Sequence, residues 1–218
     1  MMNTHNYLHE HFPGLTLEPP LFYSWPTGLR FEIAKPGSEH LDKDNLEQMG
    51  ERTTSLFKAV FEQDDDVILV TDLLGLSDSS LPKTNIFLKY IKDKDVRKKL
   101  QVERLDGRFD EEDETVTHRF SLQCKAGDIR YRPLLMAICH EDFKHPTRIL
   151  KNRRDIGIDI YIVNITRHLI YHLYDDRGCD IISAEKDTLL PLYHSASPWI
   201  LEYDREQIDE IFMKEETV

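Results

Sequence analysis

The amino-acid sequence predicts an α+β protein with a mostly antiparallel sheet, built round a C-terminal β-meander and covered by helices. Three observations predict this class. Apolar residues alternate with a period of two between residues 156 and 184, which is typical of strands. Two short polar segments interrupt that alternation, as tight turns do. Apolar residues at helical spacing follow residues 42 and 204, which indicates helices with one buried side.

Residues 156–184 are predicted to form three strands joined by two turns. Isoleucine occupies every second position from Ile156 to Ile162, and Asp159 and Tyr161 lie between these positions. The second strand also alternates, and the residues expected together on one of its faces are His168, Ile170, His172 and Tyr174. Because both strands carry apolar or aromatic residues on both faces, we expect them in the interior of the sheet.

The second turn reads Asp175-Asp176-Arg177-Gly178. Aspartate suits the first position of a type I turn, and glycine suits the last, where a positive φ costs it little. In the structural interpretation, a carboxylate braces the Arg177 guanidinium. In the alternative interpretation the turn is an active site with His172 beside it. Arg177 would then hold an oxyanion, and Asp175 or Asp176 would act as the base.

The remaining elements follow from the same two periodicities. The expected strands outside the meander are 29–33, 67–73, 100–105 and 116–122, and the last two form a hairpin with an acidic tip. The expected helices are 3–12, 42–63, 85–91, one starting at Pro133, 185–194 and 204–212. Pro191 implies a late start or a kink in the helix that contains it. We expect residues 1–218 to form a single domain, with C-terminal helices in 185–218.

The net charge of −12 argues against binding to duplex nucleic acid, which requires clustered Lys and Arg. It is compatible with a basic protein partner or with solubility alone. The candidate binding surface consists of two acidic segments, whose residues are Asp64, Asp65, Asp66, Asp110, Glu111, Glu112 and Asp113. Small acidic domains without catalytic motifs include immunity proteins, which neutralise basic toxin domains. A non-catalytic binding protein of this kind is therefore the leading hypothesis.

Cysteine usage and the amino terminus predict a cytoplasmic protein. Cys124, Cys139 and Cys179 are odd in number and lack C-x-x-C spacing, so we expect free thiols in a reducing compartment. The amino terminus has neither the cationic start nor the apolar core of a signal peptide. The best apolar run, from Val67 to Leu76, is too short to span a bilayer. The sequence leaves the oligomeric state open.

The most reactive-looking cluster is His140-Glu141-Asp142 together with His145. Successive helix positions point about 100° apart, so only some of these side chains can share a site. The histidines near the amino terminus have no cysteine beside them, and we expect neither a metal site nor a cofactor. The basic stretch 144–154 is expected to be a solvated loop, with a phosphate or an acidic segment as the alternative ligand.

The carboxy-terminal third carries a recognisable pattern, in which Tyr174-Asp175-Asp176-Arg177-Gly178 is followed by Trp199-Ile200-Leu201 and Tyr203-Asp204-Arg205. These segments resemble the signature of an uncharacterised bacterial family, catalogued as domain of unknown function three-eight-eight-five. The segment from Asp66 to Val70 is similar to that family as well. The resemblance implies one full-length domain and brings no known activity with it. The signature residues to which it draws attention are Asp176, Arg177, Gly178, Trp199, Tyr203, Asp204 and Arg205.

Overall fold

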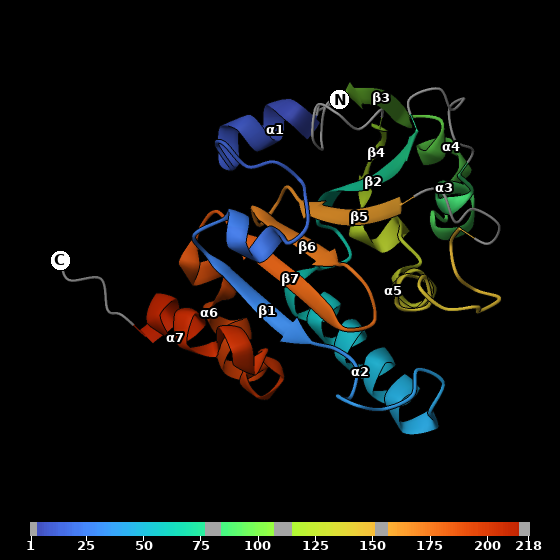
Figure 1. The fold of residues 1–218 in the computed structure, drawn as a ribbon. Coiled ribbons are helices and arrows are strands. Elements are labelled where there is room, and N and C mark those ends of the chain that lie inside the picture. The colour runs from blue at the N-terminus through green and yellow to red at the C-terminus, as the bar shows by residue number, and fades with distance from the viewer. Residues whose placement is uncertain (1–3, 77–83, 107–114, 151–156, 214–218) are drawn as a thin grey trace.

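The computed structural model describes residues 4–76, 84–106, 115–150 and 157–213. Its strands form a seven-stranded antiparallel sheet in the order β1-β7-β6-β5-β2-β4-β3 (Figure 1). The strands are β1 (Gly28–Glu32), β2 (Asp66–Leu76), β3 (Gln101–Asp106), β4 (Thr115–Lys125), β5 (Gly157–Asn164), β6 (Leu169–Leu173) and β7 (Gly178–Ser183). The predicted α+β class with a mostly antiparallel sheet is confirmed. The tip of the β3–β4 hairpin lies outside the described residues.

Six of the seven described α-helices lie near expected positions, and α4 was not expected. They are α1 (Thr4–His11), α2 (Lys43–Val60), α3 (Ile86–Tyr90), α4 (Lys94–Arg97), α5 (Tyr131–Cys139), α6 (Lys186–Ser195) and α7 (Arg205–Met213), with short 3₁₀ helices η1 (Leu21–Ser24), η2 (Ala126–Asp128), η3 (Ser197–Trp199) and η4 (Glu202–Asp204). The helix expected to start at Pro133 begins earlier, at Tyr131. Proline then lies in the first turn, where no helical hydrogen bond needs its missing N–H.

The predicted meander is confirmed as β5, β6 and β7, and it lies inside the sheet between β1 and β2. Every residue of β6 and β7 is buried. One detail of the prediction was wrong. His168 belongs to the turn before β6, with a φ of 50°, so it does not share a strand face with His172. Its Nδ1 lies 2.9 Å from the hydroxyl of Tyr7 on α1 instead.

Both faces of the sheet are buried, as the alternation of the meander predicted. One face packs against α2, α5 and α6, with Leu69, Ile162 and Tyr171 in that core. The other packs against α1 and the chain that follows it, around Val70 and Tyr161. Figure 1 shows α1 on one side of the sheet and both α2 and α6 on the other. Burying one such side chain contributes about 1.5–3 kcal/mol, so these two layers supply most of the favourable free energy of folding.

The cysteines are free thiols, as predicted, and all three are buried: Cys124, Cys139 and Cys179. Burial raises the pKa of Cys124 to about 12, so its reactive thiolate form is scarcely populated at neutral pH. None of the helices in the described part of the chain is long and apolar enough to cross a bilayer.

A row of ionisable side chains crosses the α1 face of the sheet from one edge strand to the other. Its members, from β3 to β1, are Glu103, Arg119, Asp72, Asp159, His172, Asp180 and Arg30. Residues paired across antiparallel strands share a face, so these side chains meet their neighbours within the sheet. Arg119 binds Asp72 through two hydrogen bonds, of 2.8 and 2.7 Å. His172 Nε2 lies 3.7 Å from Asp159 Oδ1.

The ion pair between Arg119 and Asp72 gives a prediction about stability. Replacing Asp72 by Asn removes the negative charge beside the buried Arg119 guanidinium, so we expect the free energy of unfolding to fall by about 3–5 kcal/mol. The double variant Asp72→Leu/Arg119→Met removes both charges and should lose less stability than the single variant. Urea unfolding of the three proteins measures this order. Equal stability of the single variant and the unmodified protein would show that the pair is not needed.

Candidate functional site

The β6–β7 turn is held together by one of its own carboxylates. Asp175 accepts a hydrogen bond of 2.7 Å from the backbone N–H of Arg177 and another of 2.7 Å from its Nε, and Nη2 also binds the carboxylate. The chain after β1 fixes the turn from outside. The N–H groups of Ile33 and Ala34 donate to the carbonyls of Arg177 and Asp176, both at 2.9 Å. The expected brace between Arg177 and a turn carboxylate is therefore present.

Glycine is required at position 178 for a reason that the turn pattern did not predict. The φ of Gly178 is not positive, because among the described glycines only Gly14 and Gly37 have a positive φ. Instead, the phenol of Tyr174 occupies the position where a Cβ of residue 178 would lie, and the carbonyl oxygen of Phe31 is 3.0 Å from that position. Close approach of a side chain, not backbone conformation, thus excludes a larger residue.

The second aspartate of the turn begins a chain of hydrogen bonds into the protein. Asp176 Oδ2 lies 3.1 Å from His40 Nδ1, and His40 Nε2 lies 2.8 Å from His140 Nδ1. The rings of His140 and His145 stack with their centroids 3.8 Å apart. The ring of Phe143 stacks on that of His40. The carboxylate and the imidazole rings are therefore linked in series, and each imidazole nitrogen within this series has a defined partner.

The surroundings of His140 shift its pKa. Burial and the neighbouring rings of His145 and His40 lower its pKa from 6.5 to about 4. The next residue in the sequence, Glu141, is not a member of this hydrogen-bonded series. Glu141 accepts hydrogen bonds from the backbone N–H groups of Ile149 and Leu150, at 2.6 and 3.0 Å. Of the predicted cluster, Glu141 is thus bound to the backbone, and His140 and His145 stay together.

Asp176 also lines an open cavity of about 490 Å³ between the end of β1, the β6–β7 turn and the chain after η3. Its ionisable lining residues are Arg30, Glu32, Lys35, Tyr174, Asp176 and Arg177. Of the proposed catalytic residues, the cavity thus contains Asp176 and Arg177. Asp175 and His172 are not among its lining residues.

Arg30 connects the cavity to the buried end of the ionisable row. Its Nε lies 3.4 Å from Asp180 Oδ1 and its Nη1 3.8 Å from Asp204 Oδ2. Its Nη2 donates to the hydroxyl of Tyr174 at 3.4 Å, and its guanidinium lies over the ring of Tyr23. Burial raises the pKa of Asp180 and raises that of Tyr174 to about 12. The Arg30 guanidinium is thus the cation that faces both buried carboxylates.

His172 does not line the cavity and lies inside the sheet. It is fully buried, its ring stacks on Tyr161 at 4.3 Å, and neither ring nitrogen has a hydrogen bond within the described residues. Its Nε2 faces Asp159, as described above. The structure therefore does not bring His172 to the turn residues with which it was grouped.

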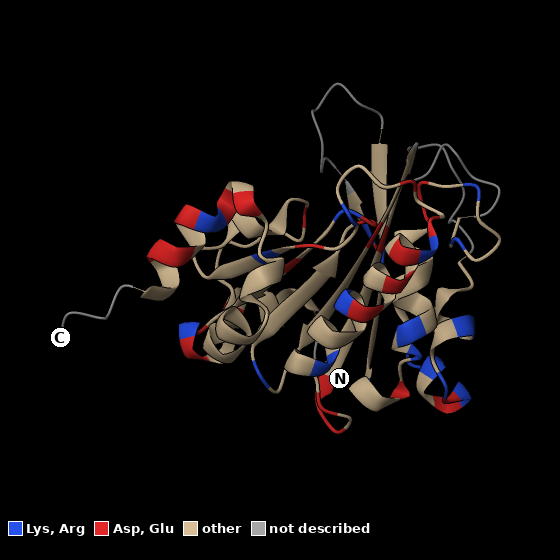
Figure 2. Ribbon diagram, turned by 90° about the horizontal axis from the view of Figure 1, so that it is seen from below, with Lys and Arg blue, Asp and Glu red and all other residues tan. Residues whose placement is uncertain are grey.

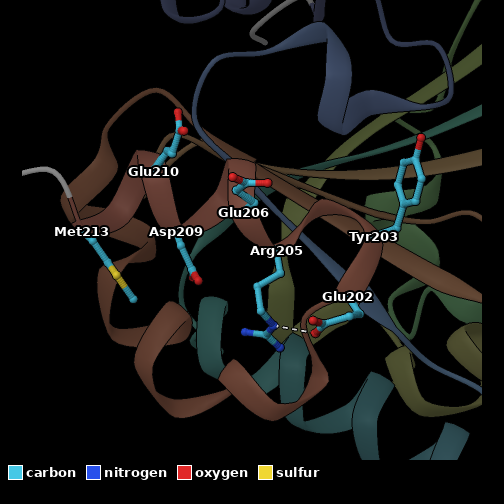
Figure 3. A pocket seen from close by; sticks show the side chains of 7 residues that line it. All are labelled: Glu202, Tyr203, Arg205, Glu206, Asp209, Glu210 and Met213. Carbon is cyan, nitrogen blue, oxygen red and sulfur yellow. Dashed lines mark hydrogen bonds and ion pairs between the residues drawn. The ribbon is translucent and has the colours of Figure 1, made fainter.

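A second candidate surface is a groove of about 690 Å³ along η4 and α7. Figure 3 shows the side chains that line it, which are Glu202, Tyr203, Arg205, Glu206, Asp209, Glu210 and Met213. Four of these are carboxylates and one is a guanidinium, so the lining is acidic. Figure 2 shows the same excess of acidic residues on the helix nearest the carboxy terminus. Tyr203 is 87 % exposed and Met213 is 67 % exposed.

The signature residues of the carboxy-terminal third have separate structural partners. Asp204 is buried and accepts a hydrogen bond of 2.7 Å from the hydroxyl of Tyr23. Arg205 donates from Nε to Glu202 at 2.8 Å and from Nη2 to the Ser197 carbonyl at 3.0 Å. Trp199 lies under the Arg52 guanidinium at 5.8 Å. Tyr203 points outward, so it is the signature residue best placed to contact another molecule.

The first predicted acidic surface divides into buried and exposed carboxylates. Asp65 is buried and binds the Asn164 side chain at 2.9 Å and Arg167 at 3.1 Å. Asp66 is half-buried and pairs with Lys125 at 2.8 Å, whereas Asp64 is exposed. The second predicted surface, residues 110–113, lies outside the described residues. So does the end of the basic stretch, from residue 151 to 154.

Histidines and carboxylates are not gathered into a metal site in the part of the chain that the structure describes. No group of three or more His, Cys, Asp or Glu side chains is arranged there to hold a metal ion. His11 near the amino terminus stacks on His168, with ring centroids 4.2 Å apart, and does not converge with another histidine on one point.

The contact at Gly178 predicts that glycine-to-alanine substitutions at residues 178 and 50 change the free energy of unfolding in opposite directions. Gly178→Ala places a methyl group against the Tyr174 phenol and should reduce the free energy of unfolding by about 1–3 kcal/mol. Gly50→Ala is the matched control. Gly50 lies within α2, where the added Cβ meets only Met136 Sδ at 3.8 Å, so this change should stabilise the helix by about 0.5–1 kcal/mol. Thermal unfolding of both variants checks the signs, and a harmless Gly178→Ala would contradict the described contact.

The lowered pKa of His140 predicts a loss of stability in acid. The unfolded chain takes up a proton near pH 6.5, but the folded protein does so only near pH 4. The unfolded state thus binds more protons between these values, and the free energy of unfolding falls as the pH falls through this window. His140→Asn retains a polar group for His40 and cannot titrate. Its urea midpoint should therefore change less between pH 7 and pH 5, and an unchanged pH dependence would exclude His140 as the cause.

Comparison with known proteins identifies the family. A family model described as "Domain of unknown function (DUF3885)" matches residues 4–204, which include the β6–β7 turn and the cavity. The chain is 30% identical over 211 residues to "Uncharacterized protein YnaE" of Bacillus subtilis (strain 168), with 93% of this chain and 99% of that protein covered. No solved structure matches. The extent of the family match and this full-length relative show that the chain belongs to the DUF3885 family.

Proposed function

We propose that the protein is a non-catalytic cytoplasmic binding protein, acting as a single unit, that holds a basic protein partner on its acidic α7 groove in the manner of an immunity protein. The observation that carries this proposal is the combination in one groove of four carboxylates with exposed Tyr203 and Met213. The net charge of −12 and the free thiols are compatible with it.

Charge alone would favour many basic molecules, and the groove offers more than charge. Tyrosine and methionine are enriched at the centres of protein interfaces, where each buries a large area at a small loss of conformational freedom. Three of the four carboxylates lie between Tyr203 and Met213 in the sequence, and Glu202 precedes Tyr203. A basic partner would be attracted by the carboxylates and anchored by the two apolar side chains.

The acidic segments predicted from the sequence fit this proposal as steering charges. Asp64 and Asp66 are the exposed and half-buried carboxylates of the first segment, and residues 110–113 form the second. Carboxylates outside the contact accelerate encounter with a basic partner, and this contribution weakens as salt is added. The same charges would repel the phosphates of nucleic acid, so no nucleic-acid partner is proposed.

The second candidate function is an enzyme with its site at the β6–β7 turn. The observation that favours it is the position of Asp176, which lines a cavity and is hydrogen-bonded to His40. A positioned carboxylate can act as a general base, and the imidazole would hold this one in place. Asp175 is already bound to Arg177 through both of its oxygens, so Asp176 is the better candidate for that role.

Reversal of two charges on α7 tests the binding proposal. In Glu206→Lys/Glu210→Lys two exposed carboxylates one helical turn apart become cations, so we expect association with a basic partner to slow by about tenfold or more at low salt. The partners to test are purified basic proteins encoded by neighbouring genes, with binding rates measured by surface plasmon resonance. Tyr203→Ala should chiefly increase the dissociation rate.

The chain supplies a matched control on another helix. Glu47 and Glu51 are also exposed and one turn apart, on α2, so Glu47→Lys/Glu51→Lys makes the same change of net charge elsewhere. Binding that the α7 variant loses and the α2 variant retains would support the groove. Equal rates for both variants, or no tight binding to any basic neighbouring-gene product, would refute the proposal.

A further inference from the structure

The cavity beside the β6–β7 turn gathers charges of both signs. Its cationic lining residues are Arg30, Lys35 and Arg177, and its anionic ones are Glu32 and Asp176. Their side chains are exposed to different degrees, 77% for Arg177 and 42% for Lys35, but only 12% for Asp176. Two cations therefore stand at the solvent side, and a carboxylate lies deeper in the wall.

Each of these charges is held by a partner outside the cavity. Arg177 is bound by Asp175, and Lys35 lies 3.6 Å from Asp44. The remaining three are fixed in the same way, and their partners are Asp180 for Arg30, Arg52 for Glu32 and His40 for Asp176. Outer partners of this kind hold a binding group in position before the ligand arrives, which reduces the entropy lost on binding.

Two of the lining residues, Asp176 and Arg177, retain unused hydrogen-bonding atoms. Asp176 uses Oδ2 for His40, and its Oδ1 makes no hydrogen bond within the described residues. Arg177 uses Nε and Nη2 for Asp175, and its Nη1 likewise makes none within them. One acceptor and one donor, both charged and on adjacent residues, are thus available to a ligand.

We propose that this cavity binds a small zwitterion, namely a free amino acid or a molecule with the same pair of charged groups. Its carboxylate would be held by Arg177 and Lys35, and its ammonium group by Asp176 and Glu32. This site is separate from the α7 groove and does not depend on the proposed protein partner.

A ligand with one sign of charge fits this lining less well. A simple anion would meet Arg177 and Lys35 but would also lie near the carboxylates of Asp176 and Glu32, and a simple cation would have the converse difficulty. A zwitterion satisfies both sets at once. The polar lining also disfavours an apolar ligand, since an apolar molecule would leave these charges desolvated and unpaired.

The size of the cavity agrees with this class of ligand. Small-molecule sites measure about 300–1,000 Å³, and the volume of about 490 Å³ lies in the lower part of that range. Leu201 and Ala34 supply apolar contacts in the same wall, against which an aliphatic part of the ligand would pack. The opening faces solvent, so entry requires no rearrangement of the sheet.

Calorimetric titration of the full chain with a panel of free L-amino acids tests the proposal. We expect at least one to bind, and we expect its N-acetylated and its carboxamide forms to bind at least about tenfold more weakly, since each lacks one charged group. Lys35→Gln and Arg177→Gln should each weaken binding of the free amino acid by about tenfold or more. Both substitutions change side chains only, and thermal unfolding checks that each variant folds.

Lys98→Gln is the matched control, because Lys98 is an exposed lysine on the chain after α4 that pairs with a carboxylate, Asp95. Binding that is retained in Lys98→Gln and weakened in both cavity variants supports the proposal. Three results would overturn it: no amino acid binds at millimolar concentration, the cavity variants bind as well as the unmodified protein, or the N-acetylated form binds equally. Because the α7 residues are unchanged, none of these results bears on the proposed protein partner.

Discussion

The structure depends on the burial of both faces of the central strands. β5, β6 and β7 have a layer of helices on one side and α1 on the other, so any ionisable residue within them must find a partner inside the protein. That constraint produces the row of ionisable side chains across the α1 face. It also gives Arg30 its position, because two buried carboxylates, Asp180 and Asp204, require a cation between them and solvent.

The two candidate surfaces adjoin at this end of the sheet. The N–H of Leu201 donates to the Arg30 carbonyl at 2.9 Å, which joins the chain before η4 to β1. Leu201 lines the cavity, and the α7 groove begins at the next residue, Glu202. The carboxy-terminal segment is therefore fixed to the sheet edge through backbone and ion-pair contacts. A rigidly attached segment suits a binding surface, since it loses little conformational entropy when a partner docks.

Much of the fold was predictable because the meander shows its period directly in the sequence. Alternating isoleucines predicted the strands, and the burial of both faces predicted their place in the sheet interior. His168 was misplaced because a histidine continues the alternation although its backbone is already in the turn. The requirement for Gly178 was attributed to turn conformation, whereas it comes from the Tyr174 ring, whose position depends on tertiary packing.

The site was less predictable because its members are far apart in the chain. Asp176 and Arg177 were singled out, but His40 was not, since nothing in its neighbourhood indicates a bond to residue 176.

The account rests on the meander as the most stable part of the protein, and amide hydrogen exchange tests this most directly. The amides of β5 and β6 should exchange only through global unfolding, with a protection free energy equal to the free energy of unfolding. Exchange in β5 and β6 that is faster than in α2 would contradict the account.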